Sequence, residues 1–275
     1  MSSSDAAACL RPLRALISDL DGTLLAGNRA QPDLLHFLDF LRRRGIALTV
    51  VTNNTVRTPA QYSRKLGAAG ADVPPGQILT AAIATAAYLQ AELPPASRIF
   101  VVGESGLCAA LVEAGFVLLE DSVQLAAAVV VGGDRTVSHD KLKHAIRHVR
   151  RGARFIGTNP DLLVPVEDGL APEAGVLLAA IAAGAGVRPI VVGKPEPPLL
   201  EQALRLMDST PAATAILGDR LDTDILGGQR LGLTTILVTT GVDDVAAIRT
   251  RGITPDLVVA GLGALTDLWE ESGVL

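Results

Sequence analysis

The feature that most constrains the fold is a regular alternation of short apolar segments with segments of helical periodicity. Residues 32–45 carry apolar side chains at the spacing of a helix that buries one face, and Gly45 follows as a stop. The apolar segments, rich in β-branched residues, lie at 14–18, 46–52, 98–103, 127–133, 154–159, 189–194, 214–219 and 234–241. Such strands need cover on both faces, so the pattern predicts an α/β fold with a doubly wound parallel sheet.

Composition sets the limits on size and partners. The chain has 275 residues, 49% of them hydrophobic, and a formal net charge of −5, so it can form one large domain or two ordinary ones. Residues 174–187 form an uncharged, apolar stretch, and fourteen residues with three glycines predict a buried helix rather than a membrane span. The N-terminus has no apolar run of signal-peptide length, which favours a cytoplasmic protein. The mild acidity argues against nucleic acid as a partner.

Polar residues follow four of the predicted strands at the point where each strand ends. They are Asp19 and Asp21 after the first, Thr52 and Asn53 after the second, Lys194 after a third, and Asp219, Asp222 and Asp224 after a fourth. In open α/β sheets, ligands bind just beyond the carboxyl ends of the strands. The sequence therefore predicts that carboxylates, a lysine, a hydroxyl and an amide gather along one sheet edge.

The chemistry of this set indicates a metal and a phosphate. Two carboxylates ~4 Å apart repel by about 4 kcal/mol at an effective dielectric near 20, so a cation or a raised pKa must relieve them. Oxygen-only ligands favour Mg²⁺, which commonly takes one or two carboxylates together with a substrate phosphate. Lys194 and Thr52 add donors for that anion. A carboxylate can attack phosphorus to form an aspartyl-phosphate, and a second carboxyl group can act as general acid and base.

The motifs DLDGTLL, VVTNN, VVGKP and LGDRLDTDI resemble, in this order, motifs I to IV of the haloacid dehalogenase-like hydrolases. The resemblance implies a Rossmann-like core. It further implies that Asp19 is the nucleophile and a Mg²⁺ ligand, that Asp21 is the general acid/base and reaches the metal through its backbone carbonyl, and that Asp219 is a metal ligand supported by Asp224. Thr52, Asn53 and Lys194 match the phosphate-binding positions.

Motif spacing predicts the domain organisation. Only one helix and one strand fit between Asp21 and Thr52, whereas the stretch from Thr52 to Lys194 is long enough for an inserted α/β domain. We predict a discontinuous catalytic core, 1–78 plus 190–275, and a cap domain, 79–189. This arrangement resembles the type 2 cap. GTNPD (157–161), GLAPEAGVLLAAI (169–181) and TPDLVVAGLGAL (254–265) are similar to the branch of nitrophenylphosphatases and phosphoglycolate phosphatases.

The resemblance implies a Mg²⁺-dependent phosphatase of small phosphomonoesters. The substrate types are sugar phosphate, phosphoglycolate, glycerol phosphate, pyridoxal phosphate and nucleotide. APEAG (171–175) departs from the glycine-rich run typical of the branch, so substrate identity is not carried over. The alternatives are another phosphotransferase of the family, a dehalogenase that needs neither Asp21 nor Mg²⁺, and a catalytically silent phosphometabolite-binding protein. The expected partners are a small phosphorylated metabolite and a second copy bound through the cap, with no membrane.

Two further sets of residues have open interpretations. Asn159 and Asp161 follow a predicted cap strand, so they are candidates for contacts with the leaving group of the substrate. Turn chemistry explains them equally well. His144 and His148 have a spacing that can bind zinc on a helix, but the apolar residues of that helix lie on another face. We expect both histidines on a solvated helix face.

Overall fold

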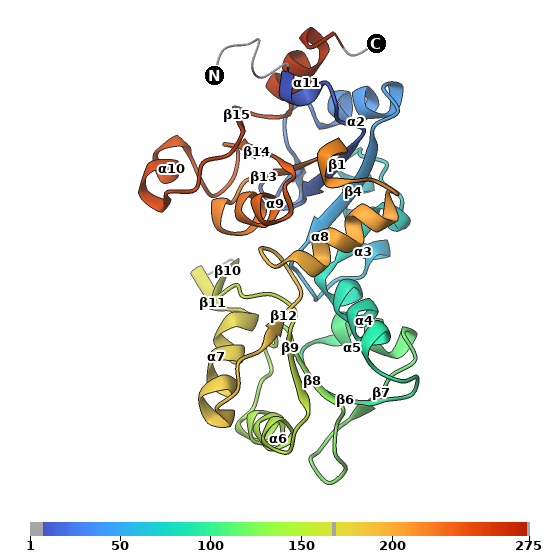
Figure 1. Cartoon of the computed structure of the whole chain (residues 1–275), viewed down its shortest axis with the longest axis vertical. Coiled ribbons are helices and arrows are strands. Elements are labelled where there is room, and N and C mark those ends of the chain that lie inside the picture. The colour runs from blue at the N-terminus through green and yellow to red at the C-terminus, as the bar shows by residue number, and fades with distance from the viewer. Residues whose placement is uncertain (1–7, 167–168, 274–275) are drawn as a thin grey trace. The chain divides into compact units, whose positions relative to one another are not determined.

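The computed structural model describes residues 8–166 and 169–273 (Figure 1). By their internal contacts these residues divide into two compact units. Unit 1 contains the described residues up to Thr52, then Pro59–Leu79 and Lys194 onward; unit 2 contains Asn53–Thr58 and the described part of Thr80–Gly193. The sequence-based division placed 53–58 in the core, whereas the contacts of this segment lie within unit 2. Elsewhere the predicted boundaries differ from those of the units by a few residues.

Unit 1 is built on a six-stranded sheet with the strand order β15-β14-β13-β1-β4-β5. Its elements are β1 (Ala15–Asp19), β2 (Leu25–Ala26), β3 (Arg29–Ala30), α2 (Leu34–Arg43), β4 (Ala47–Thr52), α3 (Pro59–Ala68), β5 (Ile78–Thr80), α8 (Pro197–Leu206), β13 (Thr214–Gly218), α9 (Leu226–Leu231), β14 (Thr234–Val238), α10 (Val245–Arg251), β15 (Leu257–Val259) and α11 (Leu262–Glu271). A π-helical turn, η3 (Leu221–Ile225), precedes α9.

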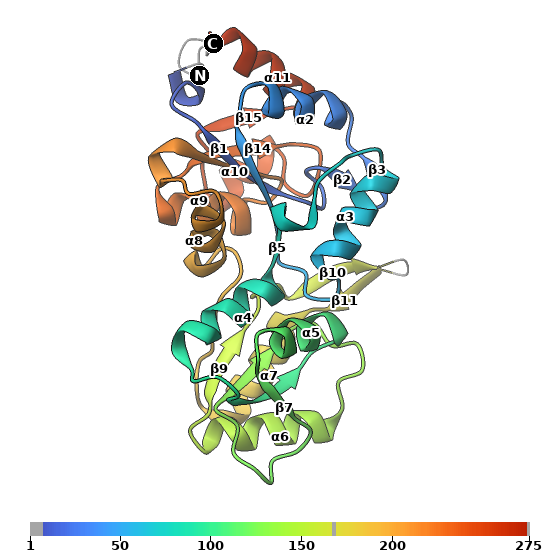
Figure 2. The same ribbon diagram turned by 90° about the vertical axis from the view of Figure 1, so that its right-hand side faces the viewer.

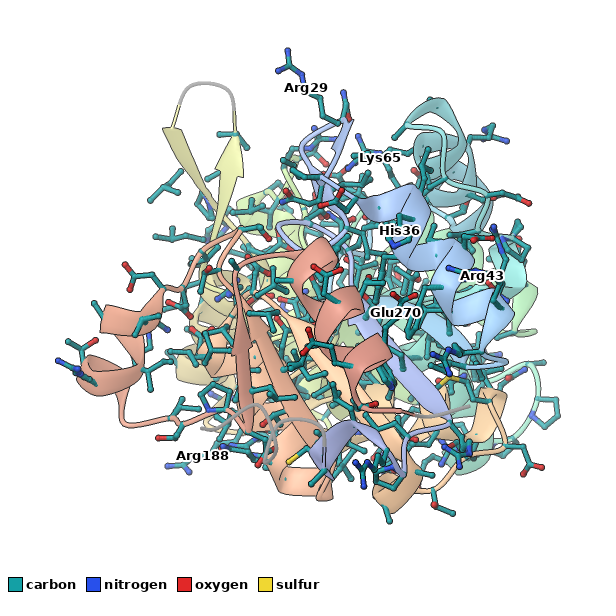
Figure 3. The ribbon with its side chains drawn as sticks, turned by 90° about the horizontal axis from the view of Figure 1, so that it is seen from above. Arg29, His36, Arg43, Lys65, Arg188 and Glu270 are labelled. Atoms are coloured by element: carbon teal, nitrogen blue, oxygen red, sulfur yellow. The ribbon has the colours of Figure 1, made fainter. Side chains whose placement is uncertain are left out.

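The central strands of unit 1 are parallel, and every residue of β1 and β13 is buried. Helices α8 and α9 pack together beside the sheet, and α2 and α11 pack together on its other side (Figure 2). The second pair is held by Phe40 and Trp269, whose ring centroids lie 5.7 Å apart, and by an ion pair between Arg43 and Glu270 (Figure 3). Helix α2 buries every apolar residue that its periodicity indicated except Leu35, which is exposed.

Unit 2 has a five-stranded parallel sheet of its own with the order β12-β9-β8-β6-β7. Its elements are α4 (Ala81–Glu92), β6 (Arg98–Val102), α5 (Ser105–Glu113), β7 (Val117–Leu119), β8 (Ala128–Val131), α6 (His139–Arg150), β9 (Arg154–Gly157), the hairpin strands β10 (Leu163–Val166) and β11 (Gly169–Pro172), α7 (Ala174–Ala185) and β12 (Ile190–Val191). The predicted α/β class is confirmed, with a sheet in each unit.

Two expectations for helices of unit 2 need correction. The uncharged stretch forms α7, but only one side of it is buried, through residues such as Leu178 and Ile181. The expectation for His148 is wrong: its side chain is fully buried against Phe100 rather than solvated. The ring contacts Phe100, a residue of the unit 2 core, and the apolar pattern alone could not indicate this contact. None of the helices in the described part of the chain has the length and apolar character that crossing a membrane requires.

Candidate active site

The carboxyl edge of the unit 1 sheet brings together the residues of three motifs. Strand β1 lies between β4 and β13, and the chain proceeds outward from β1 in one direction and from β13 in the other. Asp19 ends β1, Thr52 ends β4, and Asp219 follows β13. This reversal of strand order is the topological switch point at which open α/β sheets bind ligands. The fold therefore places these three side chains at the expected position for a ligand site.

Lys194 connects two of the carboxylates. Its Nζ donates to Asp19 Oδ1 at 2.5 Å and to Asp224 Oδ1 at 2.6 Å, and its side chain is only 2% exposed. Asp224 lies in η3, and its Oδ2 accepts a hydrogen bond from the backbone N–H of Arg220. Asp224 is thereby fixed by two donors. It holds the lysine in place beside Asp19.

Asp219 is seated in a cradle made of backbone. Its Oδ2 accepts from the N–H of Val242 at 2.8 Å, and the hydroxyl of Thr23 lies 3.4 Å from Oδ1. A Cβ atom at Gly22 or Gly241 would overlap the carboxylate. Gly22 also has a φ of +91°, a conformation that favours glycine. The motif glycine is therefore needed both for the turn and for the close approach of Asp219.

The electrostatics of this cluster show a shortage of positive charge. Carboxylate oxygens of Asp19, Asp219 and Asp224 lie within 4.8 Å of one another, with one lysine among them. Burial raises the pKa of Asp19 well above its ordinary value, although Lys194 opposes the shift. Burial and the charge of Asp224 raise the pKa of Asp219 to about 6. Burial alone would lower the pKa of Lys194, but the two carboxylates raise it.

This donor set fits a magnesium ion. The cluster offers only oxygen ligands and has more negative than positive charge, which is the condition under which a hard divalent cation binds. Asp19 and Asp219, the two predicted carboxylate ligands, both belong to this cluster. The side chain of Asp21 is not part of this cluster, and metal contact through its backbone carbonyl stays a prediction.

Asp21 lies on the loop after β1 with a half-exposed carboxylate. Its Oδ1 accepts from Nζ of Lys65 at 3.0 Å. Lys65 comes from α3 (Figure 3). The loop is held by N–H groups of Leu24 and Leu25, which donate to the carbonyl of Leu20. The Asp21 carboxylate is therefore accessible to solvent on a loop whose backbone is held by hydrogen bonds. Sequence reasoning missed Lys65 because a lone lysine on an amphipathic helix carries no motif.

The remaining candidates lie in unit 2. Asn53 donates through Nδ2 to Asp161 Oδ2, and Asn159 donates through Nδ2 to the carbonyl of Asn53, both at 2.9 Å. Asn159 is fully buried. Glu173 was not singled out by the sequence; it accepts hydrogen bonds from Asn159 and from the backbone N–H of Ala174, but its burial raises its pKa. Asn159 and Asp161 thus contact a predicted phosphate-binding residue.

Comparison with known proteins identifies the family. A sequence model described as haloacid dehalogenase-like hydrolase matches residues 16–117, and a second model of HAD-like hydrolases matches residues 191–265. The chain is 37% identical to a dihydroxyacetone phosphatase of Corynebacterium glutamicum over 93% of this chain and 91% of that protein.

Solved structures agree with the sequence matches. The structure of a p-nitrophenyl phosphatase from Archaeoglobus fulgidus superposes with a TM-score of 0.88 at 31% identity, covering 93% of this chain and 98% of that one. The structure of a glycerol phosphate phosphatase from Mycobacterium tuberculosis, in complex with magnesium, superposes with a TM-score of 0.85 at 30% identity, covering 94% and 77%.

Proposed function

Because this chain belongs to the haloacid dehalogenase-like hydrolases, in their nitrophenylphosphatase-like branch, we propose that it hydrolyses small phosphomonoesters with Mg²⁺ through an aspartyl-phosphate. The observation that carries the proposal is the set of Asp19, Lys194, Asp219 and Asp224 at the carboxyl edge of the unit 1 sheet. This set supplies three requirements of the chemistry: one nucleophile, one ammonium for the phosphate and enough carboxylate oxygen for a cation.

The two aspartates of motif I have different environments that suit different roles. Asp19 is held by Lys194 through Oδ1, so its second oxygen is the one we assign to attack phosphorus. Asp21 is half exposed and lies outside the carboxylate cluster, and we assign it to donate a proton to the leaving oxygen as the ester bond breaks. In the second half-reaction Asp21 takes a proton from water, which attacks phosphorus, releases inorganic phosphate and restores the Asp19 carboxylate.

The other residues are assigned to bind the phosphate and the cation and to orient Lys194. Lys194 and Thr52 bind the phosphate oxygens, with Asn53 as the next residue in the chain, and Asp224 keeps Lys194 directed at Asp19. Asp19, Asp219 and the backbone carbonyl of Asp21 are the ligands we assign to Mg²⁺. When bound, the cation supplies positive charge that offsets the carboxylates and the phosphate. Positioning and electrostatic stabilisation account for most of the catalysis of phosphoryl transfer.

We propose small sugar and polyol phosphates as the substrate class, so that the leaving group is a sugar or a polyol. Relatives and structural neighbours act on dihydroxyacetone phosphate, glycerol phosphate and nitrophenyl phosphate, as their names state. Phosphoglycolate, pyridoxal phosphate and nucleotides stay in the test panel. We assign unit 1 as the catalytic core and unit 2 as the cap. A homodimer formed through unit 2 and a cytoplasmic location remain predictions from the sequence.

The test is release of inorganic phosphate from this panel, with Mg²⁺ or with a chelator, by wild-type protein and by Asp19→Asn. We expect Mg²⁺-dependent release, fastest for the small sugar or polyol phosphates and abolished in the variant. Release that continues without divalent cation, or in Asp19→Asn, would contradict the proposal. A folded wild-type protein that releases no phosphate from any ester would favour the phosphometabolite-binding alternative.

A further inference from the structure

Two of the four crossings of the chain between the units fall inside the predicted phosphate-binding motifs. Thr52 has its contacts in unit 1 and Asn53 in unit 2, and Gly193 has its contacts in unit 2 and Lys194 in unit 1. Each of these two boundaries is therefore a single peptide bond next to a residue assigned to the phosphate. Asn53 belongs structurally to the cap unit, although it is covalently joined to the core residue Thr52.

One turn of unit 2 forms hydrogen bonds with the residues at both of these crossings. This hinge clasp consists of Thr158, Asn159 and Asp161. The carbonyl of Thr158 accepts from the N–H of Gly193 at 2.8 Å. Asn159 Nδ2 donates to the carbonyl of Asn53, and Asp161 Oδ2 accepts from Asn53 Nδ2. The clasp thus fixes the backbone of Asn53, the side chain of Asn53 and the backbone just before Lys194.

Asn53 and Gly193, the unit 2 residues at these two crossings, also lie against each other. A Cβ atom at Gly193 would lie 2.7 Å from Oδ1 of Asn53 and would overlap the carbonyl oxygen of Thr158. Gly193 has no positive φ that would require glycine. Its lack of a side chain is instead explained by the close approach of Asn53 and the clasp. Any group added at position 193 must therefore displace Asn53 or open the clasp.

The amide of Asn159 is fully used. Its Oδ1 accepts from the N–H of Asp161 at 3.0 Å, and its Nδ2 donates to Asn53 and also to the Glu173 carboxylate at the start of α7. The residue is 1% exposed. A buried amide whose donors and acceptor are all engaged keeps one orientation, because a flip would leave buried polar groups without partners. The polar atoms of Asn159 are thus engaged with neighbouring residues of unit 2.

We infer that Asn159 and Asp161 are positioning residues, which act on phosphate binding through Asn53 rather than by contact with the leaving group. The inference rests on the proposed function, in that Asn53 is taken as a phosphate-binding residue. It replaces the two open interpretations of these residues, leaving-group contact and simple turn formation, with a defined third role. The hydrogen bonds of the clasp set the position of Asn53 relative to its own unit.

Inorganic phosphate is the probe that separates these roles, because it has no leaving group. The measurement is the competitive inhibition constant of phosphate, with Mg²⁺, against nitrophenyl phosphate and against glycerol phosphate. We expect Asn159→Ala to weaken the binding of phosphate on the order of 10-fold, which is the effect of one lost hydrogen bond to a fixed partner. We expect the same factor with both substrates, and similar loss in Asn53→Ala.

A double-mutant cycle gives a readout that general destabilisation would not imitate. If Asn159 acts through Asn53, the double variant Asn53→Ala/Asn159→Ala binds phosphate no more weakly than Asn53→Ala alone. Additive losses would overturn the inference. So would an unchanged phosphate constant in Asn159→Ala combined with a KM change that differs between the two substrates, since this is the signature of leaving-group contact.

Two matched pairs keep the test valid if Asn159→Ala fails to fold. Asp161→Asn retains an oxygen that can accept from Asn53, so phosphate inhibition stays near wild type, whereas Asp161→Ala weakens it. Gly193→Ala should weaken the binding of phosphate, because the added methyl group clashes with Asn53. Gly67→Ala should leave phosphate binding unchanged, because there is open space around position 67. If the two variants of each pair had equal inhibition constants for phosphate, the inference would be overturned.

Failure of the inference and failure of the proposed function are distinguishable. Calorimetric titration with phosphate and Mg²⁺ measures binding without turnover. If Asn53→Ala leaves phosphate binding unchanged, the positioning role falls, while loss of turnover in Asp19→Asn still supports the aspartyl-phosphate chemistry. If Asp19→Asn retains turnover, the proposed chemistry falls, whatever the clasp variants do.

Discussion

The two units have the same kind of sheet, but a buried carboxylate at its carboxyl edge is paired differently in each. In unit 1, Asp19, Asp219 and Asp224 share one lysine, and burial raises the pKa of Asp19. In unit 2, Asp134 follows β8 and is equally buried, but it has Lys141 at 2.5 Å and Thr136 at 2.9 Å. Burial would raise the pKa of Asp134, yet these hydrogen bonds lower it. A parallel sheet supplies the position, and the residues after its strands decide whether it carries chemistry.

The largest expected difference comes from removing one buried carboxylate from each unit. Asp19→Asn should lower kcat by about 10⁴-fold or more, because the nucleophile is lost. Without Mg²⁺ it should not lower the melting temperature, because an excess negative charge is removed. Asp134→Asn should leave kcat unchanged and destabilise unit 2 by about 1–3 kcal/mol, because it breaks a charged hydrogen bond. Steady-state kinetics and thermal unfolding measure both. Loss of turnover in Asp134→Asn would break the comparison.

The next difference comes from the two lysines. Lys194→Ala leaves Asp19 and Asp224 buried without an ammonium, so we expect a loss of about 3–5 kcal/mol in unfolding free energy. Lys141→Ala should cost less, about 1–2 kcal/mol, because the buried Asp134 keeps two hydrogen bonds from Thr136. Denaturant unfolding followed by the fluorescence of Trp269, the single tryptophan, reports on unit 1. Equal losses in the two variants would contradict the difference in pairing.

Metal ions should act on unit 1 alone. At ~100 times its dissociation constant, Mg²⁺ should raise the unfolding free energy by ~2.7 kcal/mol, because it binds only the folded cluster. The Trp269 transition should shift in wild-type protein. It should not shift in Asp219→Asn, which lacks one predicted ligand. Asp134→Asn is the control in which the shift persists. A Mg²⁺ shift of equal size in Asp219→Asn would show that the cation binds elsewhere.

The smallest effect is a pH dependence of unit 2. His148 accepts from the N–H of Ala126 through Nδ1 and donates through Nε2 to the carbonyl of Asp121. The neutral form of the ring satisfies both hydrogen bonds. Burial lowers the pKa of His148 below its ordinary value of 6.5. The unfolded chain therefore binds a proton first as the pH falls, and unit 2 should lose stability below about pH 6.5. Hydrogen exchange of the β8 amides at pH 5.5 and 7.5 checks this. His148→Gln should remove the dependence, and the same slope in that variant would assign it to another group.

The sequence predicted what depends on local pattern. Alternating periodicities located the main strands and α2 to within a few residues, and motif spacing placed Asp19, Thr52 and Asp219 at adjacent strand ends. Short elements such as β2, β3 and the β10–β11 hairpin were missed because two to four residues carry too little periodicity. Each of these elements pairs with its immediate neighbour along the chain.

What the sequence could not predict depends on contacts between distant segments. The Lys65–Asp21 ion pair joins residues 44 apart, and the bond between Asn53 and Asp161 joins residues 108 apart. Neither Lys65 nor Glu173 belongs to a motif. The assignment of 53–58 to unit 2 likewise follows from tertiary contacts, since this segment continues directly from β4 in the sequence. Only the folded chain connects the phosphate motif with the hinge clasp.

The central claim is that the Asp19 carboxylate becomes phosphorylated, and the direct measurement is chemical trapping. Protein mixed with excess glycerol phosphate and Mg²⁺ is quenched during turnover, treated with borohydride and digested, and the peptides are read by mass spectrometry. Borohydride reduces an acyl phosphate to an alcohol and leaves free carboxylates intact. The account predicts reduction at residue 19 alone, dependent on Mg²⁺ and enriched in Asp21→Ala, which slows hydrolysis of the intermediate. Turnover without modification at residue 19, or with modification at Asp219 or Asp224 instead, would contradict it.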